Sequence, residues 1–109
     1  MATTYKVLAQ SAPSATTATD IYTVASSTQV VISTITVCNR AATSATYRIA
    51  IRPNGATLAN QHYIAYDATV PANDTVSLTI GVTIDAADVV TVYASTANLT
   101  VNIFGAEIA

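Results

Sequence analysis

Apolar residues alternate with threonine, serine and other polar residues along most of this chain, and this period of two is the feature that most limits its fold. In the segment 46–52 (TYRIAIR), Tyr and Ile occupy the odd positions and both arginines occupy even ones. Successive side chains of a strand point to opposite faces, so one face of this segment should meet a core while the arginines face outwards. Segments 75–80 and 99–103 repeat the pattern, with Ile80 expected on the core face of the former.

The spacing of such segments predicts a single all-β domain over residues 1–109, an antiparallel β-sandwich of the jelly-roll or immunoglobulin-like kind. Eight strands are expected, at residues 4–10, 19–25, 28–39, 46–52, 61–70, 75–80, 88–95 and 99–103. Turn-forming residues separate several of them, at 53–55, 71–74 and 85–88. The small, polar stretch 11–20 is expected to be a loop or a loosely held arm within residues 1–20.

The segment 28–39 (TQVVISTITVCN) departs from simple alternation, because it carries apolar residues on both faces. One face would hold Val31, Ile35 and Val37, and the other Val30, Ile32 and Cys38. Two explanations remain open. The strand is covered on both faces, or a β-bulge near Ser33 changes which residues face the core.

Charged residues make up only 9% of the sequence, whereas hydrophobic residues make up 51%. Typical soluble domains contain about 25% charged residues, and their solubility depends on a charged surface. One interpretation is a merely polar surface of the kind found on secreted proteins. The interpretation preferred here is a surface largely covered by neighbouring subunits, since the centres of protein interfaces are depleted of charge.

Composition also disfavours two classes of partner. Only four basic residues are present and the net charge is −2, which does not provide the positive stripe that nucleic-acid binding needs. No apolar run approaches the roughly 20 residues that cross a bilayer, so no membrane association is predicted. The first ten residues lack the apolar centre of a secretory signal, which favours folding in a cytoplasm.

The sequence offers little catalytic chemistry. Cys38 and His62, the only cysteine and the only histidine, are the one nucleophile–base pair to consider. Cys38 lies within a strand pattern with no glycine turn that would form an oxyanion site. It is interpreted as a buried apolar thiol, with an intermolecular disulfide as the alternative, and His62 as an imidazole on a sheet face or at a subunit contact. No catalytic residue and no cofactor are predicted.

Metal sites are disfavoured as well. One histidine and one cysteine cannot supply the clustered ligands of a zinc site. Asp85 with Asp88, or Asn73 with Asp74, would offer two oxygen ligands each for calcium, but turn formation explains these residues with fewer assumptions. The glycines are isolated and form no phosphate-binding loop. The prediction is therefore no metal.

The six tyrosines raise the possibility of a platform on which sugar rings stack. Tyrosine combines apolar area with a hydroxyl and is enriched at protein interfaces. Strand alternation puts Tyr63 and Tyr66 on opposite faces, so they should not form a continuous platform. Subunit contact or core packing is therefore preferred, and a carbohydrate-binding module is kept as an alternative.

Five stretches of the sequence together resemble the small structural proteins of tailed-bacteriophage virions, including those of cyanophages: MATTYKVLAQSAPSATTATDIYTV, STITVCNR, YRIAIRPNGATLANQHYIAYD, VPANDTV and DVVTVYASTANLTVNIFGAEIA. The resemblance covers essentially the whole chain and is one of overall pattern. It implies a β-sandwich, commonly oligomeric, that attaches to a larger shell or tube, and it carries over no active-site residue. It does not separate head proteins from tail proteins.

The resulting expectation is a non-enzymatic capsid decoration or cement protein, assembled in the bacterial host's cytoplasm and located in the virion. Its partners would be the major capsid protein or other virion subunits, with a homo-oligomer, preferably a trimer, as its own state. A tail, baseplate or fibre-attachment protein is the alternative. Interface residues are expected in the arm 1–20, and the individual candidates are Tyr5, Lys6, Tyr22 and Tyr63.

Overall fold

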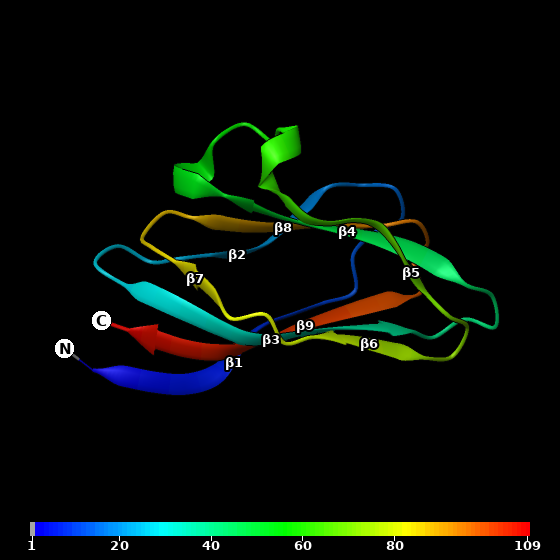
Figure 1. Ribbon diagram of the computed structural model, residues 1–109, viewed down its shortest axis with the longest axis horizontal. Coiled ribbons are helices and arrows are strands. Elements are labelled where there is room, and N and C mark those ends of the chain that lie inside the picture. The colour runs from blue at the N-terminus through cyan, green and yellow to red at the C-terminus, as the bar shows by residue number, and fades with distance from the viewer. Residues whose placement is uncertain (1) are drawn as a thin grey trace.

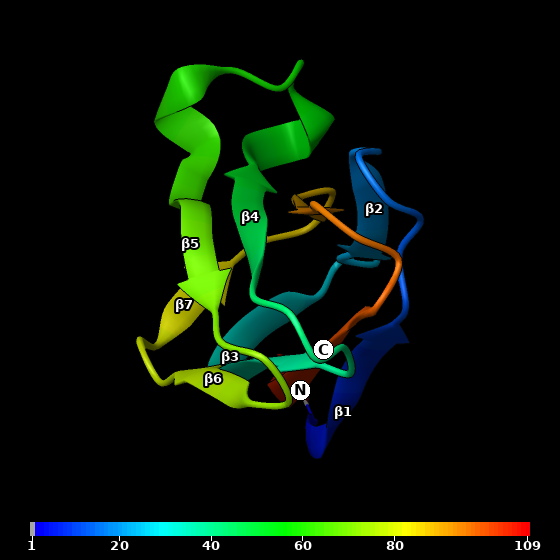
Figure 2. The same ribbon diagram turned by 90° about the vertical axis from the view of Figure 1, so that its right-hand side faces the viewer.

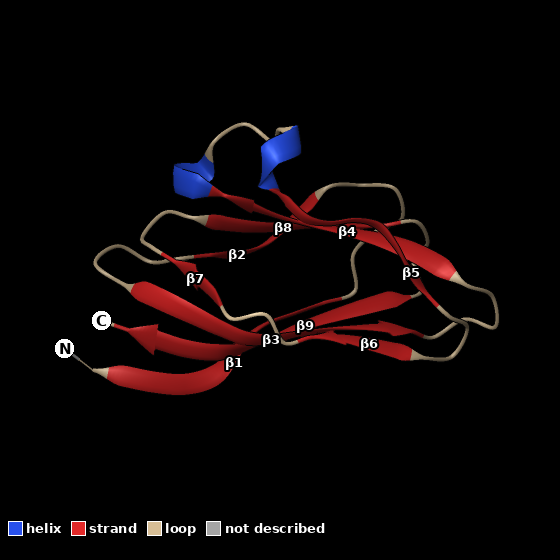
Figure 3. Ribbon diagram, viewed as in Figure 1, coloured by secondary structure: helices blue, strands red, loops and turns tan. Residues whose placement is uncertain are grey.

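The protein, seen in a computed structural model that describes residues 2–109, consists of two antiparallel sheets packed face to face (Figures 1 and 2). The strands are β1 (Thr3–Ser11), β2 (Thr19–Thr23), β3 (Gln29–Asn39), β4 (Ala45–Arg52), β5 (Tyr63–Val70), β6 (Thr75–Leu78), β7 (Val82–Ile84), β8 (Val89–Ala94) and β9 (Leu99–Ile108). The helical content of the described residues is two short 3-10 turns, η1 (Pro53–Gly55) and η2 (Asn60–His62), between β4 and β5 (Figure 3). The expected all-β sandwich is confirmed.

The strands pair as one long hairpin that has been rolled up. Its tip is the pair β4–β5, and successive pairs are β3 with β6 and β7, then β2–β8, then β1–β9. In sheet A the order is β1-β9-β3-β6, with β7 also paired to β3, and in sheet B it is β2-β8-β4-β5. This nesting is the jelly-roll arrangement, one of the two kinds of sandwich expected from the sequence.

The core lies between the two sheets and is built from the alternate residues of the central strands. Val90 and Val92 of β8 and Ile49 of β4 face Val101 and Ile103 of β9 across the sandwich, and all are nearly inaccessible to solvent. β-branched side chains predominate because they are stiff and pack well on a pleated surface. The expected alternation in segments 46–52 and 99–103 is confirmed.

A bulge in β3 explains the mixed pattern of this strand. The register of β3 with β9 shifts between Ile32 and Thr34, which places Ser33 outside the regular pairing. Because of this extra residue, Val30 and Ile32 before the bulge and Ile35 and Val37 after it all face the core. Of the two explanations left open by the sequence, the bulge near Ser33 is confirmed.

The expected core position of Ile80 is wrong. Strand β6 ends at Leu78, the chain turns at Gly81 with a φ of +62°, and a separate strand β7 begins at Val82. Ile80 lies in this break and its side chain is 53% exposed. Residues 2–109 therefore form nine strands in place of the eight expected, because the sequence signal for β7 is only three residues long.

The N-terminal segment is part of the sheet, with a tethered loop after it. All nine residues of β1 lie along β9, where they form one edge of sheet A. In the loop that follows, Pro13 is buried and the backbone N–H of Thr16 donates to the carbonyl of Ala94 over 2.7 Å. The expected loop is therefore present, but it covers residues 12–18 and is attached to β8. Met1, the first residue of the expected arm, lies outside the described residues.

Candidate functional site

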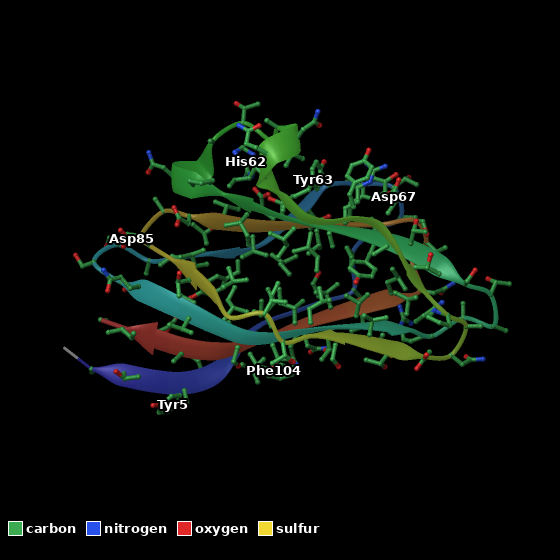
Figure 4. All side chains as sticks on the ribbon, in the orientation of Figure 1. Tyr5, His62, Tyr63, Asp67, Asp85 and Phe104 are labelled. Atoms are coloured by element: carbon green, nitrogen blue, oxygen red, sulfur yellow. The ribbon has the colours of Figure 1, made fainter. Side chains whose placement is uncertain are left out.

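The outer face of sheet A, which looks away from sheet B, carries an exposed apolar patch. Tyr5 is 83% exposed, Val7 45% and Val31 37%, and Phe104 is partly exposed beside them. Register places Tyr5 and Val31 on either side of Ala106, and Val7 beside Phe104, so these side chains share one face. Figure 4 shows Tyr5 and Phe104 projecting from this side. An open depression of about 490 Å³ lies among them.

The rest of this face is made of hydroxyl, amide and thiol side chains. They belong to the halves of β3, β6 and β9 that lie beyond the patch, and they comprise Thr34, Thr36, Cys38, Thr75, Ser77, Thr100 and Asn102. At this end of the face the guanidinium of Arg40, from the loop after β3, donates to Thr100 Oγ1 over 3.0 Å. The apolar patch and the hydroxyl region together, without Arg40 at their border, are called the uncharged face below.

The few charged strand residues of sheet A lie away from the uncharged face. The five strands of sheet A contain only two charged residues, Lys6 and Glu107. Both point into the open edge of the sandwich, where Glu107 accepts hydrogen bonds from Tyr22 Oη of β2 at 2.5 Å and from Lys6 Nζ at 3.3 Å. None of the strand residues on the uncharged face is therefore ionic.

This three-residue contact joins the edges of the two sheets and shifts two pKa values. Burial and the hydrogen bond to Glu107 raise the pKa of Tyr22 above its usual value. The hydrogen bond from Tyr22, aided by Lys6, lowers the pKa of Glu107. We call these three residues the edge clamp. The structure thus gives Lys6 and Tyr22, two of the expected interface residues, an intramolecular role.

The outer face of sheet B is different, because it gathers tyrosines around an ion pair. Arg48 of β4 donates from Nε to Asp67 Oδ1 at 2.7 Å and from Nη2 to Oδ2 at 3.3 Å. Its guanidinium carbon lies 4.2 Å from the ring centre of Tyr66 and 4.3 Å from that of Tyr93. Tyr63 meets Tyr66 at an interplanar angle of 85°, with ring centres 4.9 Å apart. These five residues are called the tyrosine cluster.

The expectation that Tyr63 and Tyr66 lie on opposite faces of their strand is wrong. The register of β5 with β4 shifts twice, between the pairs Tyr47/Ala68 and Ile49/Ala65 and again before Ala50/Tyr63. Asp67 adopts a left-handed φ of +49° in this irregular stretch. The extra residues break the alternation and bring both rings to the outside. In this strand, unlike β3, the bulges were not anticipated from the sequence.

Two hollows border the tyrosine cluster, and Tyr63 lines both. One is a cavity of about 220 Å³ between Leu58, Ala50, Thr91 and Tyr93. The other is an open depression of about 530 Å³ lined by Asn60, Tyr63 and Tyr66. The loop that carries Leu58 and Asn60 is held in place by His62, whose Nδ1 accepts the backbone N–H of Ala59 at 3.0 Å.

Cys38 and His62, the one nucleophile–base pair considered, are not brought together. Cys38 lies on the uncharged face of sheet A, whereas His62 is buried in η2 on the outer side of sheet B (Figure 4). The expectation of a buried thiol is wrong, because Cys38 points away from the core and is half-buried. His62 belongs to a turn and not to a sheet face, since residues 60–62 form a 3-10 turn before β5.

The acidic residues considered as calcium ligands are used in turns. Asp88 accepts backbone N–H groups from Asn54 and Asp85, both at 2.8 Å, and Asp85 accepts that of Ala86. Asp74 accepts the N–H of Thr75. Among residues 2–109 no group of three or more His, Cys, Asp or Glu side chains is close enough to hold a metal ion. The turn interpretation of these acids is confirmed.

Of the four residues singled out from the sequence, Tyr5 lies on the uncharged face and Tyr63 in the tyrosine cluster, so the structure does not bring them together. Sequence reasoning missed the other members of both surfaces. In the sequence, Val31 has the same parity as Ile35 and Val37, and Arg48 is recognisable only as an outward-facing arginine. Arg48 and Tyr93 lie directly opposite each other on the paired strands β4 and β8, and alternation within each segment gives no signal of that pairing.

Comparisons of the chain with protein-family models, with curated proteins and with solved structures found no match. Within the described part of the chain, none of the helical segments has the length and apolar character required to span a membrane.

Proposed function

We propose that this protein is a non-enzymatic structural subunit of a tailed-phage virion, a capsid decoration or cement protein that docks through the uncharged face of sheet A and bridges major capsid subunits. The observation that carries the proposal is the absence of ionic strand residues on that face, together with exposed Tyr5, Val7 and Val31. Large apolar surfaces on soluble proteins mark interaction sites.

The size of the uncharged face supports a stable contact. Its central strands β3 and β9 have 11 and 10 residues. Strands lie about 4.8 Å apart and rise about 3.3 Å per residue, so β1, β9, β3 and the two short strands β6 and β7 along β3 together present roughly 600 Å². A standard interface buries about 800 Å² on each partner. The face, with part of its rim, is therefore large enough for one interface.

The chemistry of the face also suits a shell. Hydroxyl groups of threonine and serine form hydrogen bonds with a partner at little desolvation cost compared with ions, and the apolar patch adds hydrophobic burial. Jelly rolls occur in viral capsid domains and in lectins, which agrees with the proposal by analogy of fold alone. Homo-oligomers, with a trimer preferred, place several such faces on one shell at once and increase avidity.

The proposal is tested on particles of the phage whose genome encodes the chain. Mass spectrometry of purified particles should detect the protein, and electron microscopy should place it on the head, in hundreds of copies, with sheet A against the shell. Six to a few dozen copies on the tail would favour the tail or baseplate alternative. Absence of the protein from purified particles would refute a virion role.

A further inference from the structure

We infer that the tyrosine cluster on sheet B, with the adjoining depression at Asn60, is a binding site for a neutral oligosaccharide. This site goes beyond the proposed structural role and does not depend on it, because it uses the opposite outer face of the sandwich. Figure 4 shows Tyr63 and Asp67 on that side, away from Tyr5 and Phe104.

The first argument is the geometry of the aromatic rings. A pyranose ring has an apolar face of C–H groups and a rim of hydroxyls, so it lies flat against an aromatic ring with the rim still free to form hydrogen bonds. Tyr63 and Tyr66 stand nearly perpendicular and together line a depression of about 530 Å³. A sugar lying against one ring brings its edge to the other. This volume falls within the roughly 300–1,000 Å³ typical of small-ligand sites.

The second argument is the number of unused polar groups around these rings. The hydroxyls of Tyr63, Tyr66 and Tyr93 and the side-chain amide of Asn60 make no hydrogen bond within residues 2–109. Arg48 engages Asp67 through Nε and Nη2, which leaves the N–H groups of Nη1 available. A polyhydroxylated ligand satisfies such donors and acceptors, whereas an apolar protein surface would leave them buried without partners.

The third argument concerns charge and rigidity. Arg48 and Asp67 neutralise each other, so the site has no net charge and favours a neutral sugar over an acidic one. The guanidinium is fixed between the rings of Tyr66 and Tyr93, which holds both rings in place before a ligand arrives. A preorganised site loses less conformational entropy on binding.

The inference is tested with the full chain on an array of neutral and acidic oligosaccharides, followed by calorimetric titration with the neutral oligosaccharide that gives the strongest signal. Tyr66→Ala should weaken binding about tenfold, the factor that corresponds to one aromatic stacking contact. Asn60→Ala should weaken it several-fold. Tyr5→Ala, on the opposite sheet, is the matched control and should bind like the wild type.

Three results would overturn the inference: no binding to any oligosaccharide of the array, preference for acidic sugars only, or equal loss of binding in Tyr66→Ala and Tyr5→Ala. Circular dichroism of each variant establishes that it is folded. If Tyr66→Ala instead releases the protein from its virion while no sugar binds, the cluster is a protein interface and the glycan site is wrong. Attachment to the virion is measured separately, so the two proposals fail independently.

Discussion

Removing one hydroxyl from the edge clamp should weaken the attachment between the two sheets. The change Tyr22→Phe keeps the ring and deletes the 2.5 Å hydrogen bond to Glu107, which is the direct side-chain hydrogen bond between β2 of sheet B and β9 of sheet A. A hydrogen bond to a charged acceptor contributes about 1.5–3 kcal/mol, and partial exposure of Glu107 reduces this to about 1–2 kcal/mol. For a domain of about 100 residues this lowers the Tm by about 5–10 °C.

The effect should depend on pH in a defined direction. The folded-state pKa of Glu107 is lowered, chiefly by Tyr22, so the stabilisation is complete above the ordinary carboxyl pKa and is lost as pH falls through the lower folded value. The folded-state pKa of Tyr22 is raised, chiefly by burial, so its stabilisation is complete below about pH 10 and is lost as pH rises further. The difference between wild type and Tyr22→Phe should therefore be greatest near neutrality.

Thermal and urea unfolding, followed by circular dichroism between pH 3 and pH 11, measure this prediction. Tyr5→Phe is the matched control, because Tyr5 is on the neighbouring strand β1 and is 83% exposed. It should change the free energy of unfolding by no more than about 0.5 kcal/mol. Equal stability of Tyr22→Phe and the wild type at pH 7, or a difference that does not narrow on acidification, would refute the role of the clamp.

Three further substitutions test other parts of the structure. Val31→Lys puts a charge on the uncharged face and should leave the Tm nearly unchanged, because Val31 is exposed. It should abolish attachment to particles in a co-sedimentation assay. Normal attachment would count against docking through this face. Gly105→Ala should lower the free energy of unfolding in urea by about 3 kcal/mol or more, because the added Cβ would clash with the carbonyl oxygen of Val31 beside the bulge. Wild-type stability would show that the backbone there adjusts without strain. Asn39→Ala should lower the free energy of unfolding by about 2–4 kcal/mol, because the buried Asn39 amide donates to the carbonyls of Thr43 and Val70 and accepts the N–H of Ala41. A loss below about 1 kcal/mol would contradict this role.

The sandwich could be predicted from the sequence because strand alternation is a local signal. Segments 46–52 and 99–103 needed no knowledge of their partners to reveal which side is buried. Local alternation could not distinguish a jelly roll from an immunoglobulin-like sandwich. It depends on which strands pair across long sequence separations, such as β1 with β9, and hydrophobic pattern carries no information about that pairing.

The composition of the two outer faces was harder to predict, because β-bulges determine which side chains point outwards. The mixed parity of β3 was visible, since both faces held apolar residues, so the bulge near Ser33 could be suggested. In β5 the apolar residues Ile64, Ala65 and Ala68 also fall on both parities, but this mixed pattern does not show where the two register shifts occur. The tyrosine cluster consequently went unnoticed. The edge clamp was also invisible, because Lys6, Tyr22 and Glu107 come from three distant strands.

The low content of charged residues was the most useful global signal in the sequence. The structure shows that the strand residues on the outer face of sheet A carry no charge. Sheet B keeps its ionic side chains on the outside, as in the pair Arg48–Asp67 and in Arg52, which donates to Asp20 over 2.9 Å. In the strands of sheet A, by contrast, the two ionic residues, Lys6 and Glu107, belong to the edge clamp. Composition alone reports the total number of charges, whereas the proposed docking depends on which face lacks them.

The reactivity of Cys38 measures the central claim most directly, because this single cysteine lies half-buried on the uncharged face. The rate at which a maleimide labels it is compared between the free chain and the assembled particle. Labelling at least tenfold slower in the particle is predicted, while a Tyr66→Cys reporter on sheet B, in a Cys38→Ser background, stays equally reactive in both states. Equal labelling of Cys38 in the free chain and in the particle would contradict docking through sheet A.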